Sequence, residues 1–184
     1  MSFVQTIKSM TNENMVNHWE ESRFSISYKD KTILDLGASY GDAAEYFIFC
    51  EAKSVICVEC HKPYFDVLVE NSKRFSGKIV PVNLMITSPQ DVEMLIRQYK
   101  PDIIKSDIEG AEIHIVNMSN EVWKYVPEYI VETHELYGYM KTNVLRDKCK
   151  ENDYIIVKDL PIYNNVLYAK KGEIKNELPT TKDK

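Results

Sequence analysis

Short apolar runs alternate with amphipathic segments along most of this chain. Seven runs rich in isoleucine, valine and leucine predict strands over 31–36, 54–59, 78–84, 101–107, 128–134, 153–159 and 164–170. Several runs are continuously apolar, which is typical of parallel strands buried on both faces. Helical patterns separate the first six runs, but no helix fits between the last two. The pattern therefore predicts five strand–helix units followed by an antiparallel hairpin.

The starts of the predicted helices carry their own signals. Asp42 is a candidate N-cap, and Glu45 three residues later would complete a capping-box arrangement. Pro63 suits the first turn of a helix. The segment 88–91, Ser-Pro-Gln-Asp, supplies a cap, a first-turn proline and an acid in order.

Apolar spacing predicts the buried faces of three later helices. One face is formed by Val92, Leu95, Ile96 and Tyr99, a second by Ala111, Ile115, Met118 and Val122, and a weaker third by Val144, Leu145 and Cys149. Residues 1–28 are interpreted as an N-terminal helical cap and 173–184 as a polar C-terminal tail. The domain between them, 29–172, is predicted to be α/β, a doubly wound and mostly parallel seven-stranded sheet with a terminal antiparallel hairpin.

Composition narrows the class of protein. Of 184 residues, 44% are hydrophobic and 28% charged, as in ordinary globular proteins. The net charge of −5 disfavours a broad nucleic-acid surface. No apolar run is long enough to span a membrane, and the first residues lack the pattern of a signal peptide. We therefore expect a cytoplasmic protein with reduced thiols at Cys50, Cys57, Cys60 and Cys149.

The segment 31–42 predicts a nucleotide-cofactor site. An apolar run ends in Asp35-Leu-Gly-Ala-Ser-Tyr-Gly-Asp42, and a helical pattern follows. Gly37 and Gly41 allow close approach of the backbone and a sharp turn into a helix N-terminus. The next predicted strand ends in Glu59, whose carboxylate can accept hydrogen bonds from both hydroxyls of a ribose.

Three motifs in order resemble the FkbM-type family of class I S-adenosylmethionine-dependent methyltransferases, with the Rossmann-like fold of that class. They are 35–42, the segment 104–112 (Ile-Lys-Ser-Asp-Ile-Glu-Gly-Ala-Glu) and the segment 130–134 (Ile-Val-Glu-Thr-His). The resemblance extends from Thr32 to Lys170. The chain departs from the pattern at Ser39, where many methyltransferases have a third glycine, and in the short segment 83–88. It also lacks an Asn-Pro-Pro-Tyr-like motif, which counts against methylation of exocyclic base nitrogens.

The resemblance implies S-adenosylmethionine as cofactor and a set of site residues. The expected cofactor-binding residues are Asp35, Gly37, Ala38, Ser39, Gly41, Asp42, Glu59, Cys60, Met85 and Asp107. The candidate catalytic residues are Asp107, Glu109 and His134, which would orient an acceptor hydroxyl and remove its proton. The implied reaction is O-methylation of a sugar or another small molecule. Glu112 is expected only to complement a helix dipole.

Several alternatives remain open at this point. A nicotinamide-dependent oxidoreductase shares the sheet pattern, but the chain lacks Gly-x-Gly-x-x-Gly. A non-catalytic binding module and an RNA methyltransferase are the other two. A metal ion held by Asp107, Glu109 and His134 is conceivable, but no metal site is predicted. Cys57 and Cys60 are interpreted as ordinary thiols, because residues three apart on a strand point to opposite faces. The sequence leaves the acceptor and the oligomeric state open.

Overall fold

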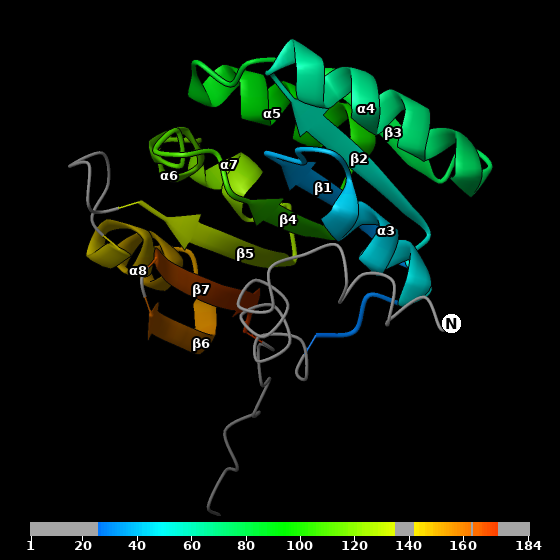
Figure 1. The fold of residues 1–184 in the computed structure, drawn as a ribbon. Coiled ribbons are helices and arrows are strands. Elements are labelled where there is room, and N and C mark those ends of the chain that lie inside the picture. Colours follow the sequence, from blue (N-terminus) through cyan, green and yellow to red (C-terminus); the bar gives the residue numbers. More distant parts are fainter. Residues whose placement is uncertain (1–25, 135–141, 163, 173–184) are drawn as a thin grey trace, which may run out of the picture.

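The computed structural model of the chain describes residues 26–134, 142–162 and 164–172, and within these ranges it does not describe the side chains of 158–165. Seven strands form one sheet in the order β3-β2-β1-β4-β5-β7-β6 (Figure 1). The strands are β1 (Thr32–Leu36), β2 (Ser54–Glu59), β3 (Ile79–Asn83), β4 (Ile103–Ser106), β5 (Glu128–Thr133), β6 (Tyr154–Ile162) and β7 (Asn164–Lys171).

The direction of the strands confirms the predicted sheet. The first five strands are mutually parallel, whereas β7 lies antiparallel between β5 and β6. The chain order reverses at β1, whose neighbours are β2 on one side and β4 on the other. In open parallel sheets ligands bind at such a switch point, outside the carboxyl ends of the strands. The topology therefore places the site beyond the ends of β1, β2 and β4.

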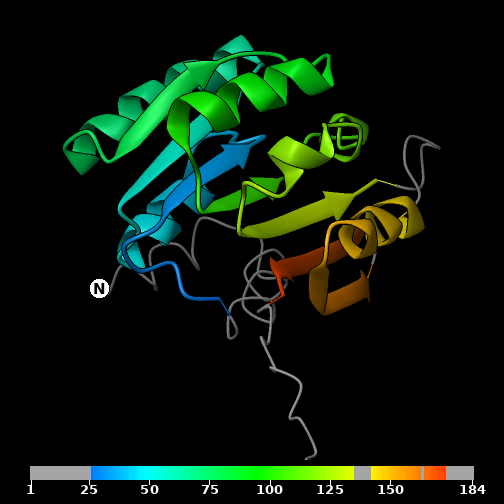
Figure 2. The same cartoon turned by 180° about the vertical axis from the view of Figure 1, so that it is seen from behind.

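Helices cover both faces of the sheet (Figures 1 and 2). On one face lie α3 (Asp42–Phe49) and α4 (Lys62–Ser72), followed by the short 3-10 helix η1 (Lys73–Phe75). On the other lie α5 (Pro89–Tyr99), α6 (Ile113–Val116), α7 (Asn120–Trp123) and α8 (Thr142–Glu151). Continuous apolar strands fit this arrangement, because each face of the sheet is buried under a helical layer.

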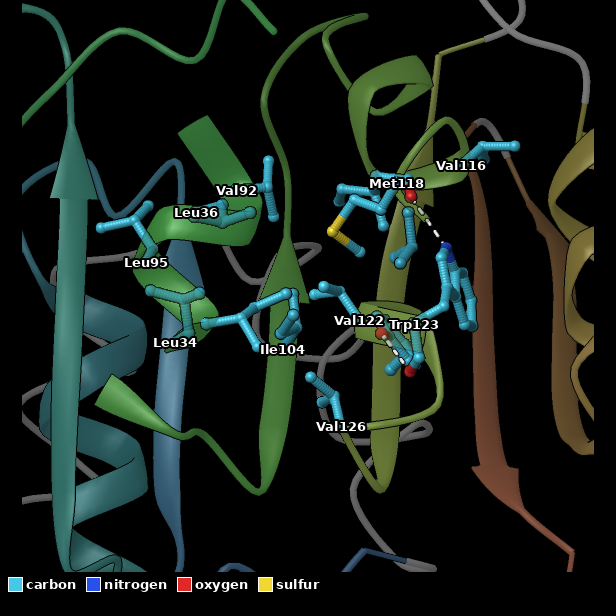
Figure 3. Close-up of a cluster of buried hydrophobic side chains, with 14 of the residues drawn as sticks. Leu34, Leu36, Val92, Leu95, Ile104, Val116, Met118, Val122, Trp123 and Val126 are labelled. Atoms are coloured by element: carbon cyan, nitrogen blue, oxygen red, sulfur yellow. Dashed lines mark hydrogen bonds between the residues drawn. The ribbon is translucent and has the colours of Figure 1, made fainter. Parts of the chain in front are cut away.

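Figure 3 shows the larger core, which lies between the sheet and α5 to α8. Trp123 is fully buried and stacks on Tyr129, with ring centroids 3.9 Å apart. Its indole N–H donates to the carbonyl of Ile115 (2.8 Å), and its own carbonyl accepts from the Tyr129 hydroxyl (2.9 Å). Every polar atom that these two rings bury thus has a partner, as large aromatic side chains in a core require.

Three predictions about helices are wrong, one of them the buried face of α8, because Val144 is exposed there. Gly41, not Asp42, is the N-cap of α3, and no side chain caps the helix. The turn needs a left-handed residue (φ 90°) at the cap, so Asp42 becomes the first helical residue and Glu45 pairs with Arg74. The predicted helical face from Ala111 to Val122 is divided, because Ser119 starts a new helix by accepting from the N–H of Val122. Ile115 lies in α6 and Val122 in α7, whereas Ala111 and Met118 lie outside both helices.

The predicted start of α5 is confirmed as a capping box. Ser88 accepts from the Asp91 N–H, and the Asp91 carboxylate accepts from the N–H groups of Ser88 and Thr87. These hydrogen bonds lower the pKa of Asp91, and the bond from the Thr87 N–H has the largest effect. We expect Ser88→Ala to lower the free energy of unfolding by about 1 kcal/mol. Urea denaturation at pH 7 measures this, and an unchanged midpoint would contradict the assignment.

Most of the predicted N-terminal cap and the whole predicted C-terminal tail lie outside the described residues. At the edge of the described part, Ile26 and Tyr28 are buried, and the Tyr28 ring lies 4.9 Å from that of Phe47. Among the described residues, none of the helices has the length and apolar character needed to cross a membrane.

Candidate functional site

A pocket opens at the predicted place, beyond the carboxyl ends of β1, β2 and β4. It encloses about 180 Å³. Its wall is formed by Gly37, Val58, Glu59, Cys60, Leu84, Met85, Ile86, Asp107, Ile108, Glu109 and Ala111. Apolar side chains with a few polar groups among them are the usual lining of a small-molecule site.

Gly37 brings two strand ends into close contact beside the pocket. Its N–H donates to the carbonyl of Val58 (3.0 Å), and its φ of 79° lies in the left-handed region. A Cβ at this position would lie 1.8 Å from the carbonyl oxygen of Asp107. Only glycine therefore permits the loop after β1 to pass this close to the end of β4.

Glu59 joins the end of β2 to the loop after β1. One carboxylate oxygen accepts from the N–H of Ser39 (2.9 Å) and the other from the N–H of His61 (2.7 Å). The side chain is buried and lines the pocket. Since a carboxylate oxygen accepts up to two hydrogen bonds, each oxygen retains capacity for a further donor.

Asp35 and Lys105 form a buried ion pair beneath the loop. The Asp35 carboxylate lies 2.9 Å from the Lys105 ammonium, without the alignment of a hydrogen bond. Lys105 also donates to the carbonyl of Gly37 (3.2 Å). Burial raises the pKa of Asp35, although Lys105 opposes the effect. Burial alone would lower the pKa of Lys105, but the nearby carboxylates of Asp35 and Asp107 outweigh it and raise that pKa.

A tight turn after β4 presents the acidic residues of 107–112. Glu109 and Gly110 have φ values of 53° and 107°, and the Glu109 side chain is 80% exposed. Glu112 is fully buried, and its carboxylate accepts from the N–H groups of Ile108 and Gly110, each at 2.9 Å. The prediction that Glu112 only complements a helix dipole is therefore wrong. It shapes the turn that carries Asp107 and Glu109.

His134 completes this group from the end of β5. It is 3% exposed, and its Nδ1 lies 3.0 Å from the Glu112 carboxylate. That carboxylate already accepts from two N–H groups, so Nδ1 is the donor in this contact. The other ring nitrogen, Nε2, lies 3.6 Å from Asp107 Oδ1 and 3.5 Å from Glu109 Oε2. The fold thus brings all three candidate catalytic residues together.

The candidate cofactor residues divide into two groups. Gly37, Glu59, Cys60, Met85 and Asp107 line the pocket. The others do not: Asp35, Ala38, Ser39, Gly41 and Asp42. Asp35 is buried in β1 and Asp42 is exposed at the start of α3, and the other three lie in the turn between these elements.

Sequence reasoning missed two features of the site. The apolar lining of Val58, Ile86, Ile108 and Ala111 was not identified, although each of them lies within three residues of a strand end or beside a named motif. The contact between Glu112 and His134 was also missed, and no local signal announces it.

The two cysteines of Cys57-x-x-Cys60 point apart, as predicted. Cys57 is buried within β2 and Cys60 is exposed. Burial first, and then the Asp35 charge, raises the pKa of the Cys57 thiol well above its usual value. A thiolate ligand is therefore disfavoured at this position.

The sheet order and the position of the pocket define a Rossmann-like fold of the class I methyltransferase type. No family model matches the sequence, and no curated protein matches it. Solved structures do. An NADB-Rossmann superfamily protein from Streptococcus agalactiae is 15% identical with a TM-score of 0.63, over 84% of this chain and 68% of that one.

Two further similar structures contain a cofactor or its product. Mycoplasma capricolum TrmK in complex with S-adenosyl-homocysteine is 14% identical (TM-score 0.62, 85% of this chain and 68% of that one). Aeropyrum pernix fibrillarin with natively bound S-adenosyl-L-methionine is 12% identical (TM-score 0.62, 85% and 74%). At these identities the comparison establishes the fold.

Proposed function

We propose that this protein is an S-adenosylmethionine-dependent methyltransferase that acts on a hydroxyl group of a sugar or another small molecule. The observation that carries the proposal is the position of Glu59, a buried carboxylate that lines the switch-point pocket beside Gly37. Two structures with the same fold, TrmK and fibrillarin, contain S-adenosyl-homocysteine and S-adenosylmethionine.

The residues around the pocket fit the parts of this cofactor. Glu59 has acceptor capacity for the two ribose hydroxyls. Leu84, Met85 and Ile86 offer apolar surface to a planar purine ring, and Met85 is 67% exposed beside the opening. The volume of about 180 Å³ is below the range of about 300–1,000 Å³ for whole-ligand pockets, so the enclosed part suits the nucleoside end.

Asp107 and Glu109 line the pocket, His134 contacts both, and this group would hold the acceptor. When bound, the cofactor supplies a methyl group for in-line displacement by the acceptor oxygen. The task of these three side chains is to orient the hydroxyl and take its proton, which makes proximity and general-base assistance the two contributions of the protein. The choice of a hydroxyl acceptor rests on the resemblance of 104–112 and 130–134 to the FkbM-type family.

We expect Glu59→Ala to weaken binding of S-adenosylmethionine about 10- to 150-fold, because hydrogen bonds to a charged group contribute about 1.5–3 kcal/mol. Isothermal titration calorimetry with S-adenosylmethionine, S-adenosylhomocysteine and NAD measures this. Glu70→Ala, an exposed carboxylate on α4, is the matched control and is expected to bind like the unmodified protein.

The same titration tests the class of protein. Binding of NAD in preference to both sulfur cofactors would move the assignment to an oxidoreductase. Absence of binding to any of the three would leave a binding module with this fold. If the sulfur cofactors bind, transfer of a labelled methyl group to hydroxylated small molecules is the next measurement.

An RNA methyltransferase is the second candidate function, and the comparisons favour it. Similar structures include one protein of Pyrococcus horikoshii named as an RNA methyltransferase and one of Streptococcus pneumoniae named as a tRNA (m1A22) methyltransferase. The net charge of −5 weighs against it, since RNA binding depends on a basic surface. Incorporation of the labelled methyl group into total RNA, and not into small molecules, would favour the RNA methyltransferase function.

A further inference from the structure

Three ligand-type side chains converge beside the pocket from two strands that are far apart in sequence. Asp107 follows β4, whereas Glu132 and His134 come from the end of β5, which pairs with β4. One oxygen of each carboxylate and one ring nitrogen all lie within 4.8 Å of one another. Glu132 and His134 are two residues apart, so they share a face of the strand.

The tautomer and the hydrogen bonding of His134 independently indicate that a cation binds at this place. His134 is buried, and its Nδ1 donates to Glu112, whose carboxylate is held in place by two backbone N–H groups. In the neutral imidazole this leaves the lone pair on Nε2. Nε2 faces carboxylate oxygens at 3.5 and 3.6 Å, which is beyond a normal hydrogen bond.

A carboxylate that fixes the far nitrogen of a histidine is the usual support of a metal-binding imidazole. We propose that Asp107, Glu132 and His134 bind one divalent cation of the manganese type. Two hard carboxylate oxygens with one imidazole suit such an ion better than they suit Ca²⁺, which prefers oxygen alone. Ligands on one octahedral ion lie about 3 Å apart, so separations of up to 4.8 Å between these atoms have to shrink by at most about 1.8 Å.

The role of this ion rests on the methyltransferase function proposed above, whereas its binding does not. A bound cation would coordinate the acceptor oxygen and make its hydroxyl more acidic. His134 then acts as a ligand, and Glu109 is left to take the proton, because it is exposed and lies outside the three ligands. The acceptor proton would pass to the Glu109 carboxylate, and the acceptor oxygen would bond to the methyl carbon. The bond from that carbon to the sulfonium sulfur would break, its electron pair staying on the sulfur of S-adenosylhomocysteine.

Titration of chelator-treated full-length protein with Mn²⁺, followed by electron paramagnetic resonance of the free ion, tests the proposal. We expect one Mn²⁺ to bind per chain. Glu132→Gln is expected to weaken Mn²⁺ binding at least about 10-fold, because loss of even a residue that only supports a metal ligand costs about 10-fold or more. Glu70→Gln, which removes one exposed carboxylate of α4, is the matched control and is expected to bind Mn²⁺ normally. Thermal unfolding checks that both variants fold.

Each outcome bears on the proposal. Absence of a stoichiometric Mn²⁺ site, or equal binding by Glu132→Gln and the unmodified protein, overturns it. S-adenosylhomocysteine binding is measured on the same samples, so the two proposals fail separately. Cofactor binding without Mn²⁺ binding would refute only the metal site, and Mn²⁺ binding without cofactor binding would refute only the methyltransferase assignment.

Discussion

Gly37→Ala is expected to lower the free energy of unfolding by about 2–6 kcal/mol. A side chain in left-handed backbone costs about 1–3 kcal/mol, and overpacking costs about 1–3 kcal/mol more. The added Cβ would lie 1.8 Å from the Asp107 carbonyl oxygen, so the end of β1 or of β4 has to move. Because both ends line the pocket, cofactor binding is expected to be lost as well. Urea denaturation and calorimetric titration measure the two effects.

Gly77→Ala is a matched control for the strain of the backbone. Gly77 has the same φ of 79°, but an added Cβ there would have no neighbour within 4 Å. It should show the cost of the left-handed conformation alone, about 1–3 kcal/mol, with cofactor binding retained. Equal losses of stability in the two variants would contradict the role assigned to the contact between Gly37 and Asp107.

Lys105→Met is expected to lower the free energy of unfolding by about 3–5 kcal/mol at pH 7, because removing one partner of a buried pair leaves an uncompensated charge. Asp35 and Lys105 are both buried, and the ammonium also holds the carbonyl of Gly37. Lys124→Met is the matched control, since its ion pair with Asp153 lies at 3.9 Å on the surface. Surface pairs contribute about 0–1 kcal/mol.

The pH dependence of the Lys105→Met variant follows from the direction of the Asp35 pKa shift. Burial raises the pKa of Asp35, and the Lys105 charge is the main influence that opposes it, so removal of Lys105 raises that pKa further. When folding raises the pKa of a group, the stability that the group contributes is fully present below its pKa in the unfolded state. That contribution is lost as the pH rises through its pKa in the folded state. The deficit of Lys105→Met should therefore grow from pH 4 to pH 7 in denaturation experiments. A deficit that is constant over this range would show that Asp35 carries no buried charge.

The strands were predictable because a local run of apolar residues in the sequence is enough to indicate that they are buried. Apolar residues stand at consecutive positions in 55–58 and in 103–104, as expected of strands buried on both faces, so this pattern needs no knowledge of neighbours. The hairpin of β6 and β7 was predictable because no helix fits between its strands. The start of α3 was not predictable, because its cap depends on the left-handed backbone of Gly41. Leu68 of α4 packs so close to Gly41 that an added Cβ would lie 2.7 Å from its side chain.

The candidate site was predictable in part, for the same reason. Gly37, Glu59, Asp107, Glu109 and His134 follow strand ends, and parallel strands bring their carboxyl ends to one edge of the sheet. Which of these side chains line the pocket and which lie beneath it depends on packing. Asp35 lies within β1, and its partner is Lys105, the residue that lies opposite it on the neighbouring strand β4.

The sequence by itself determined the order of strands and helices along the chain and the edge of the sheet at which the site lies. Periodicity, glycines and the residues at strand ends are local properties, and they suffice for these. Only the tertiary structure decided that Glu112 is a buried support of His134 and that Asp107, Glu132 and His134 converge. These contacts join residues of the segment after β4 to residues at the end of β5. Their geometry arises only when β4 and β5 pair and the turn at Gly110 closes between them.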